Sequence, residues 1–180
     1  SMVHWELLGG VIPPISASDW QAEFNHYQAS PEYQSVNRGM TVGEFKTIFY
    51  YEYAHRMLGR FIGAVFLLPF LYLYWRRRIE SRAVYKYLVM FLLGGLQGLL
   101  GWYMVQSGLV DVPHVSQYRL TAHLAAAVAI YAYILWVAFP LLSREQNSMC
   151  PSAQRGFAII VTLLVFLTML AGGFVAGLKA

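Results

Sequence analysis

The chain has 180 residues, of which 58% are hydrophobic, 16% aromatic and only 12% charged. Because about a quarter of the residues of a soluble domain are charged, this composition argues against a disordered chain, a coiled coil or a nucleic-acid-binding domain and indicates that lipid is the main solvent. The net charge is +4, and the single cysteine excludes an internal disulfide and a multi-thiolate metal site, so any metal would have to be bound by the five histidines.

The first fifty residues are too polar to span a membrane. The sequence Ser18-Asp19-Trp20-Gln21 resembles a capping box and predicts a short helix that ends near Gln28. A second box, Thr41-Val42-Gly43-Glu44, opens a helix with no breaker before the first apolar run. If this helix is continuous from Val42 to Trp75, it is about 50 Å long and projects beyond the membrane.

Four apolar runs are long enough to cross a hydrocarbon core, which takes about 20 helical residues. They are approximately Met57 to Trp75, Tyr87 to Val105, Leu120 to Leu142 and Phe157 to Leu178. Spans of this kind must be helical, because hydrocarbon offers the backbone no other hydrogen-bond partner. The fold class expected is therefore an all-α, polytopic membrane helix bundle with four transmembrane helices in this chain.

The basic residues predict the orientation of the spans. The connection RRRIESRAVYK after the first span holds five Lys or Arg and one Glu, and the connection after the third span holds Arg144 and Arg155. Both should face the cytoplasm or the mitochondrial matrix. The expected organisation is an extracytoplasmic segment (1–52) on the periplasmic or intermembrane-space side, three membrane helices (53–142), an inner loop (143–155) and a further membrane helix (156–180).

Two histidines occupy matched positions in spans that run in the same direction. His55 lies twenty residues before Trp75, and His123 lies twenty residues before Ser143, so both imidazoles are expected at one depth near the outer surface. Two imidazoles at one level on neighbouring helices are what axial ligation of a haem iron requires. The plainer interpretation is that each histidine only forms hydrogen bonds at the membrane interface.

The neighbours of these histidines suit a porphyrin. Glu52, His55 and Gly59 share one helical face, and Gly59 would let a flat macrocycle approach the backbone. Three arginines lie near the outer boundary, where haem propionates would point, although each could equally extend to lipid headgroups. These candidate propionate-binding residues are Arg56, Arg60 and Arg119.

The second span carries Gly94, Gly98 and Gly101 on one face, with Gln97 beside them, and this pattern is typical of close helix packing. Among the outer histidines only His114 is near the expected pocket, as a surface residue or, alternatively, a third ligand or proton relay. Cys150 receives no role.

Long blocks of the sequence resemble the haem A synthase family. They are YEYAHRMLGR, GLLGWYMVQSGL and VSQYRLTAHL, together with the outer segment that begins GVIPP. The similarity covers nearly the whole chain and is to the type found in mitochondria and alphaproteobacteria, which lacks the paired outer-loop cysteines of other members.

The resemblance implies an eight-helix protein of two four-helix halves, each contributing a pair of histidines to one haem site. His55 and His123 match the N-terminal pair, which holds the substrate haem O, and Glu52 matches the acidic catalytic residue of the E-x-x-H pattern. The implied reaction oxidises the porphyrin C8 methyl group to a formyl group, and the product, haem A, goes to cytochrome oxidase. On this interpretation the chain holds helices two to five, the haem b site of the C-terminal half is absent, and the chain alone is inactive.

The resemblance also implies partners: haem O, the lipid bilayer, haem O synthase and an electron donor, with homo-oligomerisation left open and no role for nucleic acid. The membrane would be the bacterial inner membrane or the mitochondrial inner membrane. Two alternatives stay open. One is a membrane b-type cytochrome that only transfers electrons, and the other is a non-enzymatic haem-handling assembly factor.

Overall fold

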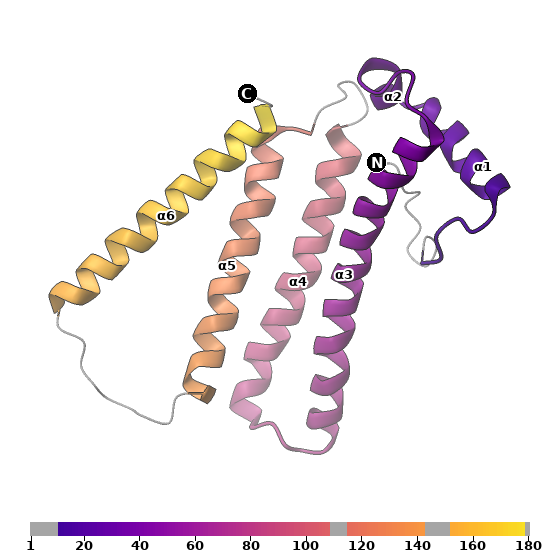
Figure 1. Cartoon of the computed structure of the whole chain (residues 1–180). Helices are drawn as coiled ribbons and strands as arrows, with labels where there is room; N and C mark the ends of the chain where they lie inside the picture. The colour runs from indigo at the N-terminus through magenta and orange to yellow at the C-terminus, as the bar shows by residue number, and fades with distance from the viewer. Residues whose placement is uncertain (1–10, 109–114, 143–151, 179–180) are drawn as a thin grey trace. The chain divides into compact units, whose positions relative to one another are not determined.

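The structure is a computed structural model that describes residues 11–108, 115–142 and 152–178. Within these residues it contains six helices and no strand, which confirms the all-α prediction (Figure 1). The chain divides into two compact units: residues 1–80 with 105–115, and residues 81–104 with 116–180. Each unit is described by itself.

The first unit opens with helix α1 (Ala17–Gln28). Its N-cap is Ser16, whose hydroxyl accepts from the Asp19 amide at 3.1 Å while the Asp19 carboxylate accepts from the Ser16 amide at 3.0 Å. The prediction that Ser18 and Gln21 form the box was therefore wrong by two residues. The box forms with Asp19 and not with Gln21, because the carboxylate of Asp19 accepts an amide hydrogen bond more strongly than the neutral side chain of Gln21 does.

A short helix α2 (Pro31–Ser35) follows, which the sequence analysis did not predict. The sequence nevertheless contains a helix-start signal, because Ser30 caps the helix and Pro31 occupies the first turn, where proline is favoured. The chain then turns at Gly39, whose φ of 89° lies in the left-handed region that glycine adopts without strain.

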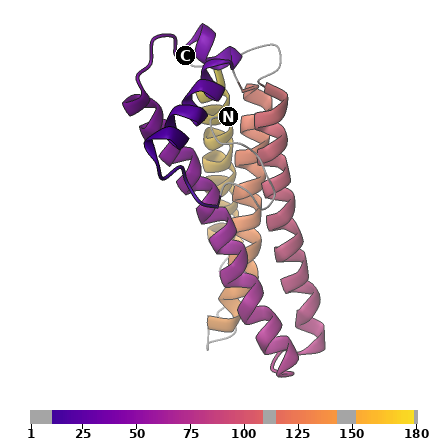
Figure 2. The ribbon, with the colours of Figure 1, turned by 90° about the vertical axis from the view of Figure 1, so that its right-hand side faces the viewer.

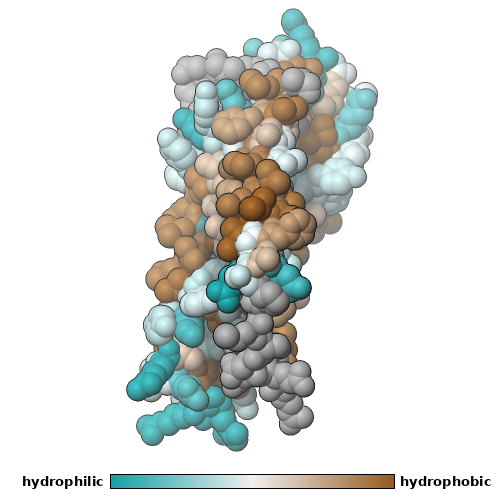
Figure 3. All heavy atoms as spheres, turned by 90° about the vertical axis from the view of Figure 1, so that its left-hand side faces the viewer, coloured by the Kyte–Doolittle hydropathy of each residue, from teal (hydrophilic) through white to brown (hydrophobic). Residues whose placement is uncertain are grey.

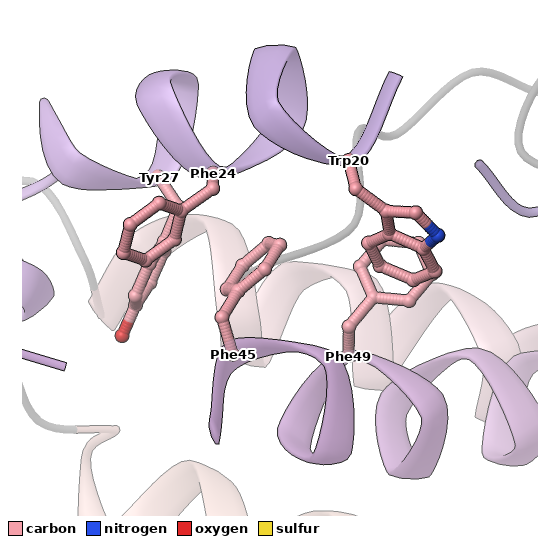
Figure 4. Close-up of a cluster of buried hydrophobic side chains, with 5 residues drawn as sticks. All are labelled: Trp20, Phe24, Tyr27, Phe45 and Phe49. Atoms are coloured by element: carbon pink, nitrogen blue, oxygen red, sulfur yellow. The ribbon is translucent and has the colours of Figure 1, made fainter. Parts of the chain in front are cut away.

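Five aromatic side chains form the core of the first unit. Trp20, Phe24 and Tyr27 of α1 point toward Phe45 and Phe49 at the start of the next helix (Figure 4). All five are at least nine-tenths buried, and Phe45 is completely enclosed. Deleting a side chain of this kind costs about 3–5 kcal/mol, so this cluster is what fixes α1 and the first turns of the next helix together. Burial also raises the pKa of Tyr27. We call this assembly the aromatic cap; Figure 2 shows from the side the ribbon of α1 and of the start of the next helix, which carry it.

Helix α3 (Val42–Trp75) runs without interruption from the aromatic cap through the first apolar run, as predicted. Thr41 and Glu44 form the expected capping box. The helix ends in a Schellman motif: Arg77 N–H donates to Tyr74 O and Arg78 N–H to Leu73 O. Arg77 has a φ of 51° at the position where glycine is usual.

The second unit contains α4 (Ser81–Gly108), which is shared with the first unit at its end, α5 (Gln117–Leu142) and α6 (Ser152–Leu178). With α3, these make four helices long and apolar enough to cross a membrane among the described residues. The four predicted spans are confirmed, and each helix extends past its apolar run at one end or both.

Large apolar side chains are exposed along these helices. On α6, for example, Leu163, Leu164 and Leu167 are each more than half exposed. Figure 3 shows brown, hydrophobic atoms across much of the face it presents. Apolar surface on this scale is stable only against lipid or protein, which agrees with a multi-pass membrane protein.

Helices α5 and α6 cross closely at one end and diverge toward the other (Figure 1). Gly173 is buried against Thr121, and a Cβ added at Gly177 would stand 2.5 Å from Gln117 Cα. The crossing therefore depends on a small-xxx-small pair that the sequence analysis did not identify.

Candidate functional site

Glu52, His55 and Gly59 lie along α3, immediately after the aromatic cap. The imidazole of His55 is exposed, and a Cβ added to Gly59, one turn further on, would meet nothing within 4 Å. The face predicted to receive a flat macrocycle therefore has an accessible nitrogen ligand and an open stretch of backbone beside it. Glu52 is one turn before His55 and its side chain is only one-quarter exposed.

Arg56 forms an ion pair with Glu52 across one helical turn, with the carboxylate on the N-terminal side, which is the favourable order. The structure thus gives Arg56 a partner within α3, whereas the sequence analysis proposed a propionate. A guanidinium has five N–H donors, so this contact does not use up its capacity. Arg60 is exposed, and its Nη1 lies 3.5 Å from Met57 Sδ.

His123 lies on α5 and is half-buried against α4. The Nε2 of Gln97 donates to the backbone carbonyl of His123 at 2.9 Å. A Cβ added to Gly101 would stand 3.0 Å from the Cε1 and 3.4 Å from the Nε2 of the His123 ring. The sequence pattern places Gln97 beside the glycine face but does not show its hydrogen bond to the His123 carbonyl. The available signal is a polar side chain inside a predicted span.

Arg119 lies one turn before His123 on α5, and its guanidinium carbon is 4.9 Å from the centre of the Tyr103 ring on α4. A cation above an aromatic face is attracted by the ring quadrupole. Tyr103 thereby restrains one face of the guanidinium group of the third candidate propionate-binding arginine. This partner was not predicted.

The glycines of α4 divide into two groups. Gly101 packs against α5 through His123, as close packing requires. At Gly94 and Gly98 an added Cβ would meet nothing within 4 Å among the described residues. The predicted packing is thus found at one of the three positions.

His55 belongs to the first unit and His123 to the second, so their convergence on one iron stays a prediction. Among the described residues no group of three or more His, Cys, Asp or Glu side chains is gathered for a metal ion. Two imidazoles still suit a haem iron, because the macrocycle supplies the other four nitrogens. The open backbone at Gly59 also fits a planar group, so the residues present fit haem.

Several residues discussed above lie outside the described part of the chain. They are His114, Arg144 and Cys150.

The chain is similar over its whole length to known proteins. The family described as cytochrome oxidase assembly protein matches residues 1–180. The chain is 51% identical to the haem A synthase of Nitrosospira multiformis and 49% identical to that of Paramagnetospirillum magneticum, in each case over 100% of this chain. It spans about half the length of these curated relatives, 51% and 52% respectively. No solved structure matches it significantly.

Proposed function

The chain belongs to the cytochrome oxidase assembly protein family, and from this premise we propose that it is part of a haem A synthase, an oxidoreductase that converts the C8 methyl group of haem O to a formyl group. The observation that carries the proposal is the face of α3 on which the exposed His55 lies between the Glu52 carboxylate and the open backbone at Gly59. A bound macrocycle on this face would lie close to a carboxylate.

His55 and His123 are the proposed axial ligands of the substrate iron. Each is on a long helix of one direction in the predicted topology. Gly59 lies one turn after His55 on α3, and Gly101 of α4 packs against the His123 ring. Imidazole is a common haem ligand, and ligation from both sides would fix the plane of the macrocycle.

The propionates are assigned to the arginines that the sequence predicts near the outer boundary of the membrane. Arg119 is held over Tyr103, and Arg60 is exposed on α3. Arg56 would bind a propionate while keeping its contact with Glu52, since its planar group offers donors along more than one edge. Binding both propionates would set which methyl group faces the carboxylate.

Glu52 is the proposed catalytic residue. Haem O supplies the methyl group and the iron. Transfer of a hydride, or of two electrons with loss of a proton, from that methyl group to an external electron acceptor would leave a positively charged carbon, to which water then adds. A carboxylate held on the same helical face either stabilises this charge in a low-dielectric site or takes a proton from the incoming water. The ion pair with Arg56 keeps the Glu52 side chain in place for both roles.

The proposed setting is the bacterial or mitochondrial inner membrane, with the aromatic cap outside. Haem O synthase and an electron donor are the proposed partners, and a second haem site, of the b type, is assigned to the part of the relatives that this chain does not cover. Without that part, we expect the 180-residue chain alone not to complete the reaction.

Pigment extraction tests the proposal. The complete open reading frame is expressed with haem O synthase in a host that makes no haem A, and the extracted haem is separated by chromatography. Haem A or hydroxylated haem O supports the synthase. Unchanged haem in a stable complex would instead support the electron-transferring cytochrome, and haem that dissociates readily, with Glu52 dispensable, would support the assembly factor.

Variants assign the ligands in the same experiment. His55→Ala and His123→Ala should each abolish tight binding of haem O, while the matched control His26→Ala on α1 should bind it normally. If either ligand variant retains the low-spin spectrum of the parent protein, that histidine is not a ligand.

A further inference from the structure

Gln97 of α4 forms a side-chain hydrogen bond to the backbone of α5. Its Nε2 donates to the His123 carbonyl at 2.9 Å, although a carbonyl inside an α-helix already has an acceptor role in its own helix. The Oε1 of the same amide is buried and accepts no hydrogen bond from the residues that the structure describes. An amide in this state is unfavourable in an apolar bundle, so packing alone would favour an apolar residue here.

Gly101, one turn after Gln97 on α4, contacts the side-chain ring of His123. The His123 ring occupies the space where a Cβ would stand, with Cε1 at 3.0 Å and Nδ1 at 3.6 Å from that point. Even a methyl group would force the imidazole to move by a few tenths of an ångström. The backbone and the ring of His123 are thus both restrained by α4, at two points that are four residues apart.

We infer that Gln97 is a positioning residue for the proposed ligand His123: its amide fixes the position of α5 along α4, and Gly101 sets the orientation of the imidazole. The inference rests on the proposed function for the identity of the group that His123 binds. Outer-shell partners of metal-binding histidines determine ring orientation, and their loss typically weakens metal affinity by about 10- to 100-fold. Here the hydrogen bond acts on the backbone of the ligand, and the steric contact acts on its ring.

The alternative is that the contact only stabilises the helix pair. A buried polar residue that specifies register differs from one that merely stabilises, because its loss changes the geometry of the site as well as the free energy of unfolding. The test therefore needs a spectroscopic signal from the haem in addition to a measure of stability.

The experiment uses the complete protein purified with haem O. Gln97→Met keeps the length of the side chain but removes the donor, and Leu96→Met, at an exposed neighbouring position, is the matched control. Gly101→Ala adds the methyl group against the ring, and its control is Gly95→Ala, where an added Cβ meets nothing within 4 Å. The measurements are the rate of haem transfer to apomyoglobin, the largest g-value of the ferric haem and the thermal unfolding temperature of the haem-free protein.

We expect Gln97→Met to release haem about ten-fold faster or more and Gly101→Ala to shift the largest g-value, with both controls unchanged. Parent-like release and g-values in both variants would overturn the inference, as would a loss of thermal stability without a change in either haem signal. If Gln97→Met does not fold, the Gly101→Ala variant tests the inference by itself, and an unchanged largest g-value in that variant overturns the inference. Failure of the proposed function has a different signature, since His123→Ala would then bind haem normally.

Discussion

The side chain of Glu52 is only one-quarter exposed, and it lies one helical turn before the proposed ligand His55. If it acts on the reacting carbon, Glu52→Gln keeps the shape and removes the charge, so we expect turnover to fall by about 10²-fold or more. Haem O content should stay within about two-fold of the parent. The measurement is the rate of haem A formation per bound haem O, with Glu23→Gln on α1 as control. Loss of haem binding together with activity would assign Glu52 a structural role instead.

Asp19 gives a prediction about pH. Hydrogen bonds from the side chain and the backbone of Ser16 lower the pKa of this carboxyl in the folded protein. Its contribution to stability is therefore complete above the ordinary carboxyl pKa, near 4, and is lost as the pH falls through the lowered value. Fluorescence of the adjacent Trp20 should report loosening of α1 in this range, and Asp19→Asn should remove that pH dependence. An unchanged acid transition in the variant would contradict the assignment.

At single residues the sequence indicates candidate side chains but does not show what they contact. Glu52 and Arg56 were both identified, but their ion pair depends on the rotamers that α3 permits. Tyr103 and Gln97 were not assigned to their partners, because each partner lies on another helix. Spacing within one helix can be read from the chain, whereas the rotation of one helix against another cannot.

Among the helices, the crossing of α5 and α6 offers the clearest test. In Gly177→Ala the new methyl carbon would collide with the backbone of Gln117, so the two helices must separate. We expect a loss of about 1–3 kcal/mol in the free energy of unfolding. Gly172→Ala, where an added Cβ meets nothing within 4 Å, should cost nothing. The measurement is reversible unfolding in mixed micelles, and equal stability of the two variants would refute the assignment of this contact.

The limits of the helices were predicted where the signal is local. Thr41 and Glu44 set the start of α3 by side-chain hydrogen bonds that span three residues, and the prediction was confirmed. At α1 two overlapping boxes competed, and the sequence pattern did not show that Ser16 with Asp19 would form. The close approach of α6 to α5 needs Gly173 and Gly177 to face a neighbour, which no pattern within α6 alone establishes.

For the whole molecule, the predicted orientation can be tested with the one cysteine of this chain. In the complete protein with every other cysteine replaced, Cys150 should react with a membrane-impermeant maleimide only after the cells are permeabilised. In a Cys150→Ser background, Gln34→Cys on the exposed side of α2 should react in intact cells. The reverse pattern would place the arginine-rich connection outside and overturn the topology.

The unbroken course of α3 has a mechanical consequence. The helix is held at its start by Phe45 and Phe49, and Glu52 follows on the same rod before any break or bend. A rotation of the aromatic cap about the axis of α3 would therefore also move the Glu52 carboxylate, which lies about one turn further along the same helix. In the proposed topology, a protein bound to the aromatic cap would therefore alter the position of Glu52 without entering the membrane.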